Sequence, residues 1–125
     1  MKVLLVDDEA DIRLIAALSL SEVGDMEVAQ ADSGSEGIQR AREDRPDVIL
    51  LDMMMPGLDG PATFQALRSD PATSDIPVVF LTAKAMSSEV DRWKSLGALG
   101  ILIKPFDPMI LPRLLRELLD EGRPG

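Results

Sequence analysis

Five short apolar runs, spaced about 20 to 30 residues apart, constrain the fold of this chain more than any other feature. The runs comprise residues 3–6, 26–29, 48–51, 78–81 and 101–103. Four of the five are almost uninterrupted, which is typical of strands covered on both faces of a parallel sheet. The spacing therefore predicts five buried parallel strands, with a longer segment between consecutive strands.

The segments between these runs carry the signals of helices. In the first segment, apolar residues follow one another at helical spacing: Ile12, Ile15, Ala16 and Leu20. Ser33 and Glu36 have the form of a capping box, which predicts a helix from there to about residue 44. Two later segments place proline at the first expected helical position, in Gly60-Pro61 and Asp107-Pro108.

This alternation of strand and helix predicts the fold class. Short connections between alternating elements imply right-handed crossovers and a doubly wound α/β sheet. We expect a flavodoxin-like, five-stranded parallel sheet of order 2-1-3-4-5, with helices on both faces. A chain of 125 residues suits one domain, which we place at residues 1–121, followed by a short tail at 122–125.

Composition excludes several classes of function. The chain contains no Cys and no His, so it has no disulfide, no thiolate or imidazole metal ligand and no histidine base. Its net charge of −9 argues against direct binding to nucleic acid. The apolar runs fall far short of the ~20 residues that a membrane span needs. We therefore expect a cytoplasmic protein that does not bind membranes.

The residues that follow the apolar runs are the candidates for chemistry, because ligands bind at the carboxyl ends of strands in doubly wound sheets. These residues are Asp7, Asp8, Glu9, Asp52, Thr82 and Lys104. Each has an ordinary structural explanation when taken alone, since aspartate forms caps and turns, threonine suits strands and lysine suits solvated loops. Their gathering at one edge of the sheet is harder to explain in that way.

Three of these residues predict a metal site. The strand order makes the first and third strands neighbours, which brings Asp7, Asp8 and Asp52 together. Two carboxylates 4 Å apart repel by about 4 kcal/mol at an effective dielectric constant near 20, so one takes up a proton or a cation binds. Oxygen ligands select a hard ion, and we expect Mg²⁺, with Mn²⁺ as a substitute.

A carboxylate beside Mg²⁺, with a hydroxyl and a lysine in reach, suits phosphoryl transfer. Asp52 is then the nucleophile that forms an acyl phosphate. Lys104 neutralises charge on the phosphoryl oxygens and Thr82 donates a hydrogen bond to them. Ala83 is small and leaves the approach to Asp52 open.

Five motifs then occur in order at matching spacing. They are Leu-Val-Asp-Asp-Glu at 5–9, Val-Ile-Leu-Leu-Asp at 48–52 with Met-Pro-Gly-Leu-Asp-Gly at 55–60, Pro-Val-Val-Phe-Leu-Thr-Ala at 77–83, Gly-Ala at 97–98 and Lys-Pro-Phe at 104–106. With these motifs the chain resembles, over essentially all its length, the receiver domain of bacterial two-component response regulators. The likeness is to the single-domain, chemotaxis-regulator type.

The resemblance implies a role for each matching residue. It makes Asp52 the phospho-acceptor and implies that Asp8 and Asp52 bind Mg²⁺ directly, Asp7 through water and Met54 through its backbone carbonyl. The family's switch hydroxyl and phosphate-binding lysine correspond to Thr82 and Lys104. A further implication is that the bond from Lys104 to Pro105 is cis.

The resemblance also implies partners. The phosphoryl donor is a phosphohistidine on a sensor histidine kinase or a histidine phosphotransfer protein, or a small molecule such as acetyl phosphate. The output is a changed affinity for a target protein, or self-dimerisation, through the face made by the fourth helix, fifth strand and last helix. Such a protein is a switch that phosphorylates and dephosphorylates itself, not an enzyme with a separate substrate.

Four positions concern switching or packing. Ile101 stands where the family usually has its switch aromatic, and we hypothesise that it reports phosphorylation poorly. In the family, the positions of Met54 and Lys84 flank the path of water to the acyl phosphate. An apolar Met54 therefore predicts a longer phosphoryl lifetime than a polar residue there would give. Trp93 falls on the predicted fourth helix, where a partly buried packing residue is favoured over a residue that contacts a partner.

Rival interpretations differ in what they require. The chain is alternatively a receiver cut from a longer regulator whose effector domain is missing. An aspartate-nucleophile phosphatase needs Asp-x-Asp-x-Thr, but Met54 stands two residues after Asp52. A flavin-binding module needs a phosphate loop rich in Ser, Thr and Gly, whereas the acids at 7–9 repel phosphate. A binding-only pseudo-receiver is disfavoured because every pocket residue is present.

Overall fold

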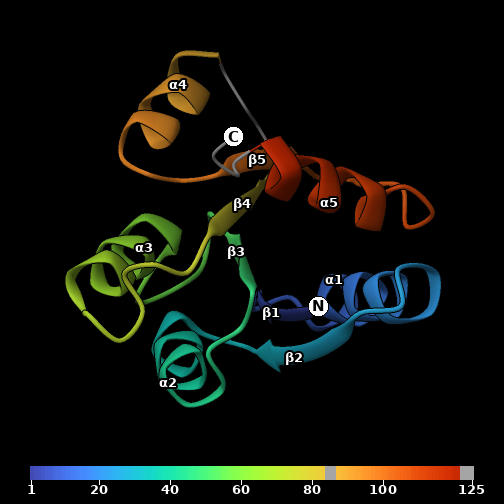
Figure 1. Ribbon diagram of the computed structural model, residues 1–125, viewed down its shortest axis with the longest axis horizontal. Coiled ribbons are helices and arrows are strands. Elements are labelled where there is room, and N and C mark those ends of the chain that lie inside the picture. The colour runs from blue at the N-terminus through green and yellow to red at the C-terminus, as the bar shows by residue number, and fades with distance from the viewer. Residues whose placement is uncertain (84–86, 122–125) are drawn as a thin grey trace.

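A five-stranded, all-parallel sheet of order β2-β1-β3-β4-β5 forms the centre of the protein, which confirms the predicted fold class (Figure 1). The computed structural model describes residues 1–83 and 87–121. The strands are β1 (Lys2–Val6), β2 (Glu27–Ala31), β3 (Val48–Asp52), β4 (Val78–Thr82) and β5 (Gly100–Ile103). The helices are α1 (Ala10–Leu18), the π-helical turn η1 (Ser19–Val23), α2 (Gly34–Asp44), α3 (Gly60–Ser69), α4 (Ser87–Ser95) and α5 (Leu111–Glu121).

Helices cover both faces of the sheet, as the uninterrupted apolar runs predicted. One apolar cluster lies between the sheet and the pair α1 and α5, and it contains Val3 and Leu5 of β1. The other cluster lies on the opposite face, under α2, α3 and α4, and it contains Leu4 and Val6 (Figure 1). Successive residues of β1 thus point to opposite faces and are buried on both.

Trp93 of α4 is a packing residue, as expected. Its side chain is 9% exposed, and its ring lies 5.4 Å from that of Phe80 and 6.4 Å from that of Phe64, measured between centroids. The three aromatic rings join α4 and α3 to β4 on one face of the sheet.

Helix α1 departs from the predicted apolar face. Ile15 was expected on the buried side, but it is 44% exposed, whereas Ala16 and Leu20 are fully buried. Ala17 is buried too, so the buried stripe centres between Ala16 and Leu20 and leaves Ile15 about a third of a turn away.

Two of the predicted helix starts are correct and one is wrong. The Ser33 Oγ accepts a hydrogen bond from the Glu36 N–H at 3.1 Å, and α2 ends at Asp44 as predicted. Pro61 lies in the first turn of α3, and Asp59 is the N-cap residue of this helix. However, α5 begins at Leu111 and not at Pro108, because the carbonyl of Asp107 first closes a separate turn.

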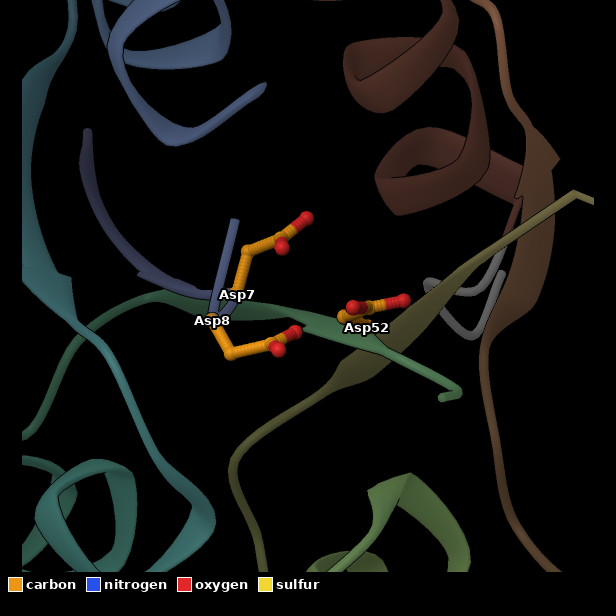
Figure 2. A group of neighbouring side chains, drawn as sticks. All are labelled: Asp7, Asp8 and Asp52. Atoms are coloured by element: carbon orange, nitrogen blue, oxygen red, sulfur yellow. The ribbon is translucent and has the colours of Figure 1, made fainter. Parts of the chain in front are cut away.

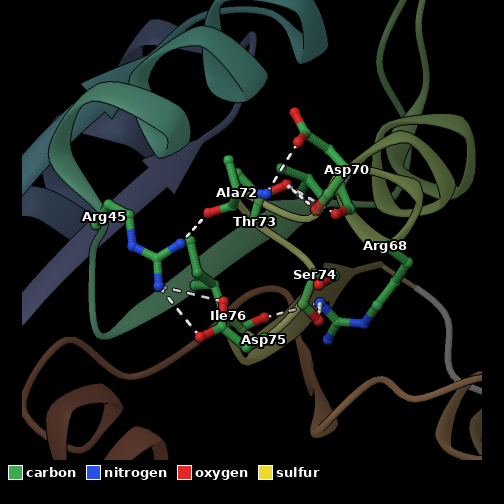
Figure 3. A network of polar contacts seen from close by, with 9 residues as sticks. Arg45, Arg68, Asp70, Ala72, Thr73, Ser74, Asp75 and Ile76 are labelled. Atoms are coloured by element: carbon green, nitrogen blue, oxygen red, sulfur yellow. Dashed lines mark hydrogen bonds and ion pairs between the residues drawn. The ribbon is translucent and has the colours of Figure 1, made fainter.

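The loop of residues 70–77, between α3 and β4, is held by arginine side chains from two helix ends (Figure 3). Arg45 donates to the carbonyl of Ala72 and forms an ion pair with Asp75, at 3.1 Å between Nη2 and Oδ2. Arg68 donates to the carbonyl of Ile76 at 2.8 Å. These contacts fix the entry into β4, the strand whose far end carries Thr82.

None of the helices within the described residues has the length and apolar character that a membrane span requires. Lys84 and the predicted tail at 122–125 lie outside the described residues, so the boundary at residue 121 stays a prediction.

Candidate functional site

Three carboxylates converge at the carboxyl edge of the sheet, as Figure 2 shows. Asp7 and Asp8 directly follow β1, and Asp52 is the last residue of β3. Because β1 and β3 are parallel neighbours, their carboxyl ends meet, and one oxygen from each acid lies within 4.8 Å of the others. The structure therefore brings together the acids that the sequence predicted as one site.

The three acids differ in their access to solvent. Asp7 is fully buried and Asp52 is 2% exposed, whereas Asp8 is exposed. Two buried carboxylates side by side are costly unless positive charge compensates them.

Lys104 supplies part of that positive charge. Its Nζ lies 2.9 Å from Oδ2 of Asp7 and 3.2 Å from Oδ1 of Asp52, and 3.6 Å from Oε1 of Glu9. The lysine follows β5, two strands away from β3, and its flexible side chain crosses the end of β4. The structure thus places the ammonium group between the two buried acids.

Backbone N–H groups donate to one oxygen of each buried acid, and the second oxygens of the two acids differ in their contacts. Oδ1 of Asp7 accepts from the N–H of Glu9 at 2.9 Å, and Oδ1 of Asp52 accepts from the N–H of Met54 at 3.3 Å. Oδ2 of Asp7 contacts the lysine, whereas the buried Oδ2 of Asp52 has no hydrogen-bond partner among the described residues. Such an oxygen is ready to receive an electrophile or a cation.

Burial first, and then the charge of Asp7, raise the pKa of Asp52 from 3.8 to about 6, although Lys104 acts in the opposite direction. For Lys104, burial acts to lower the pKa, but the contacts with Asp7 and Asp52 outweigh it and raise the pKa. At neutral pH Asp52 is therefore mostly ionised, at an energetic cost that a bound cation removes.

The donor set fits a hard divalent cation. Three carboxylates within 4.8 Å of one another offer only oxygen ligands, and Asp52 Oδ2 lacks a partner within the described part of the chain. The exposed Asp8 leaves one side open to water molecules, which Mg²⁺ usually keeps.

The sequence matches the response regulator receiver domain family over residues 3–116. The chain is a response regulator receiver domain. It is 42% identical over 120 residues to response regulator PleD of Caulobacter vibrioides, covering 94% of this chain and 26% of that protein. It is 41% identical over 118 residues to the probable transcriptional regulator ycf27 of Guillardia theta, covering 94% and 45% respectively.

Solved structures agree with this assignment. Chemotaxis protein CheY4 of Vibrio cholerae superposes with a TM-score of 0.85 at 34% identity, covering 94% of this chain and 97% of that one. A response regulator of Chloroflexus aurantiacus gives a TM-score of 0.83 at 32% identity, covering 95% and 97%. The receiver domain therefore spans nearly all of these two solved chains, but half or less of the curated relatives named above.

The remaining predicted residues take the following places in the receiver domain. Thr82 ends β4 and is 6% exposed, and Ala83 beside it is exposed. Met54 is 75% exposed. Ile101 is partly buried, pairs with Phe80 across the sheet and packs on the cluster under α4.

The bond between Lys104 and Pro105 is cis, which confirms what the resemblance implied. The roles of these residues in metal binding, phosphorylation and switching stay predictions.

The sequence did not assign a role to two residues at the site. Glu9 is exposed, yet its carboxylate contacts the ammonium of Lys104. Gly60 lies so close to β3 that an added Cβ would stand 2.5 Å from the carbonyl oxygen of Asp52 and 2.7 Å from Cα of Met53. The signals for Gly60 in the sequence are its place before the proline of the first helical turn and at the end of the motif at 55–60.

Proposed function

We propose that this receiver domain accepts a phosphoryl group on Asp52 in a reaction that depends on Mg²⁺, and that phosphorylation changes its binding to a partner. The observation that carries the proposal is the ammonium of Lys104, placed between the buried carboxylates of Asp7 and Asp52. A group that neutralises two acids at rest is in position to contact phosphoryl oxygens when one of those acids becomes an acyl phosphate.

In the proposed reaction, Asp52 forms a bond to phosphorus through a carboxylate oxygen. Its Oδ2 is suited to this role because it has no hydrogen-bond partner among the described residues. The bond from phosphorus to the donor breaks at the same time, and the donor leaves with the electron pair. For a phosphohistidine the leaving atom is an imidazole nitrogen, and for acetyl phosphate it is an acetate oxygen.

The residues around Asp52 stabilise the charge that develops on the phosphoryl oxygens. The ammonium of Lys104 contacts one oxygen, and the hydroxyl of Thr82, at the end of the adjacent strand, donates to another. Asp7, Asp8 and Asp52, with the carbonyl of Met54, hold Mg²⁺, or Mn²⁺ in its place. The ion, when bound, offsets negative charge on the carboxylates and the phosphoryl group.

The given sequence contains no histidine, so a phosphohistidine donor lies outside these 125 residues. We assign that donor to a sensor histidine kinase or a histidine phosphotransfer protein. We assign the output to the face of α4, β5 and α5, where a target protein or a second copy binds. The domain works in the cytoplasm and has no substrate besides its phosphoryl donor.

The alternative is that the receiver controls an effector domain in a longer protein. It is favoured by the length of PleD and ycf27, of which this chain covers 26% and 45%. The same phosphorylation chemistry serves both interpretations.

The test is incubation with acetyl phosphate and Mg²⁺, followed by intact-mass measurement. We expect the wild type to gain one phosphoryl group in Mg²⁺ and none in EDTA. The Asp52→Asn variant should gain none under either condition. The matched control is Asp32→Asn, which makes the same charge change at an exposed position after β2. A phosphoryl group gained by both the wild type and Asp52→Asn would reject Asp52 as the acceptor.

A further inference from the structure

A buried serine occupies an apolar position of the segment that follows β1. Ser19 is 3% exposed and lies where α1 passes into η1, on the same side as the buried Ala16 and Leu20. A hydroxyl in such a place is costly unless it forms a hydrogen bond. Its Oγ donates to the carbonyl of Pro108, which is 89 residues away in the chain.

That carbonyl belongs to the short loop that carries Lys104. At the start of the loop, the N–H of Lys104 donates to the carbonyl of Thr82 at 2.7 Å. In the middle, Phe106 packs against the apolar cluster beneath α1 and α5. At its far end, the bond from Ser19 to Pro108 holds the loop against η1. The loop is thus held at these three points. Besides the contacts of the Lys104 ammonium itself with Asp7 and Glu9, the bond from Ser19 joins the loop to the segment after β1.

The same segment carries the acids that Lys104 contacts. Asp7 and Glu9 lie just before α1, and Ser19 lies at its other end. A helix is a stiff spacer, because each residue adds a fixed rise of about 1.5 Å. Ser19 therefore ties the lysine-bearing loop to the body that carries the acids.

Two further contacts join η1 to α5 and make this connection firm. Arg116 of α5 donates to the carbonyl of Gly24, the residue after η1. A Cβ added at Gly24 would stand 2.7 Å from Cβ of Pro112, so the backbone of Gly24 lies close against the proline ring of α5.

We infer that Ser19 is a positioning residue for Lys104. Its hydrogen bond to Pro108 holds the loop so that the ammonium stays between Asp7 and Asp52. The inference rests on the proposed function for its effect on phosphorylation, but its effect on Lys104 itself is independent of that function.

The first test compares phosphorylation rates with acetyl phosphate. We expect Ser19→Ala to lower the rate constant at saturating donor about tenfold, since small displacements of a catalytic group cost this much or more. The matched control is Ser21→Ala, which removes a hydroxyl bonded at 2.8 Å to Ala17 within the same helical segment. We expect its rate to equal that of the wild type.

A second background separates positioning from general stability. If Ser19 acts through Lys104, then Ser19→Ala has no further effect on the residual rate of Lys104→Ala. An equal loss in both backgrounds, or no loss in either, would overturn the inference.

A spectroscopic measurement tests whether Ser19 positions the Lys104 ammonium, and it does not require phosphorylation. The chain has only four lysines, so the ¹⁵N resonance of the Lys104 ammonium can be assigned in lysine-labelled protein. We expect it to shift and to exchange faster with water in Ser19→Ala, but not in Ser21→Ala. An unchanged resonance would overturn the inference, whereas a wild type that never gains a phosphoryl group would overturn only the proposed function.

Discussion

Replacing Asp52 by asparagine should stabilise the metal-free protein at neutral pH. Asparagine has nearly the same shape as aspartate but carries no charge. The wild-type carboxylate is 2% exposed and lies beside Asp7, so its ionised form is disfavoured in the folded state. The unfolded chain imposes no such penalty.

The magnitude follows from the pKa of Asp52, which rises from 3.8 to about 6 on folding. Because the folded state binds more protons than the unfolded state between these values, stability falls as pH rises through this window. At 1.36 kcal/mol for each pH unit, the full penalty above pH 6 is about 3 kcal/mol. At pH 4 most of the penalty is absent, because Asp52 is protonated in the folded state.

The assay is urea unfolding in EDTA at pH 4 and pH 7, with free energies of unfolding from linear extrapolation. We expect Asp52→Asn to gain up to about 3 kcal/mol over the wild type at pH 7 and well under 1 kcal/mol at pH 4. Asp32→Asn controls for the change in net charge at an exposed site. An advantage of Asp52→Asn that is the same at both pH values would contradict a penalty from the buried charge, and so would a variant less stable than the wild type at pH 7.

Further predictions concern the metal, the close glycine and the lifetime of the phosphoryl group. Mg²⁺ at a hundred times its Kd should stabilise the wild type by about 2.7 kcal/mol and Asp8→Asn far less, measured as a shift in thermal unfolding; equal shifts would contradict the assigned ligand. Mg²⁺ should quench Trp93 fluorescence little, because this ring packs with Phe64 and Phe80 under α4, and strong quenching would place the ion elsewhere. Gly60→Ala should cost about 1–3 kcal/mol in urea unfolding, since its Cβ overlaps the β3 backbone, and an unchanged midpoint would count against this packing. Met54→Asn should shorten the phosphoryl lifetime by admitting water to the acyl phosphate. A lifetime equal to or longer than that of the wild type would show that Met54 does not hinder water.

The sequence alone determined the sheet and the place of its chemistry. Uninterrupted apolar runs are compatible with burial on both faces, so they predicted parallel strands covered by helices, and the structure has them. Because parallel strands end at one edge, the residues after each run had to gather there. The sequence was therefore enough to group Asp7, Asp8 and Asp52, and the structure brings them together.

Tertiary structure decided the features that depend on how one segment lies against another. Helical periodicity places Ile15 and Ala16 on neighbouring parts of one helix, but only packing on the sheet exposes the first and buries the second. The same holds for Lys104, whose reach was predictable from its length but whose contacts with Asp7 and Asp52 depend on the loop that carries it. The bond that holds this loop joins residues 89 positions apart, and no local pattern in the sequence encodes such a pairing.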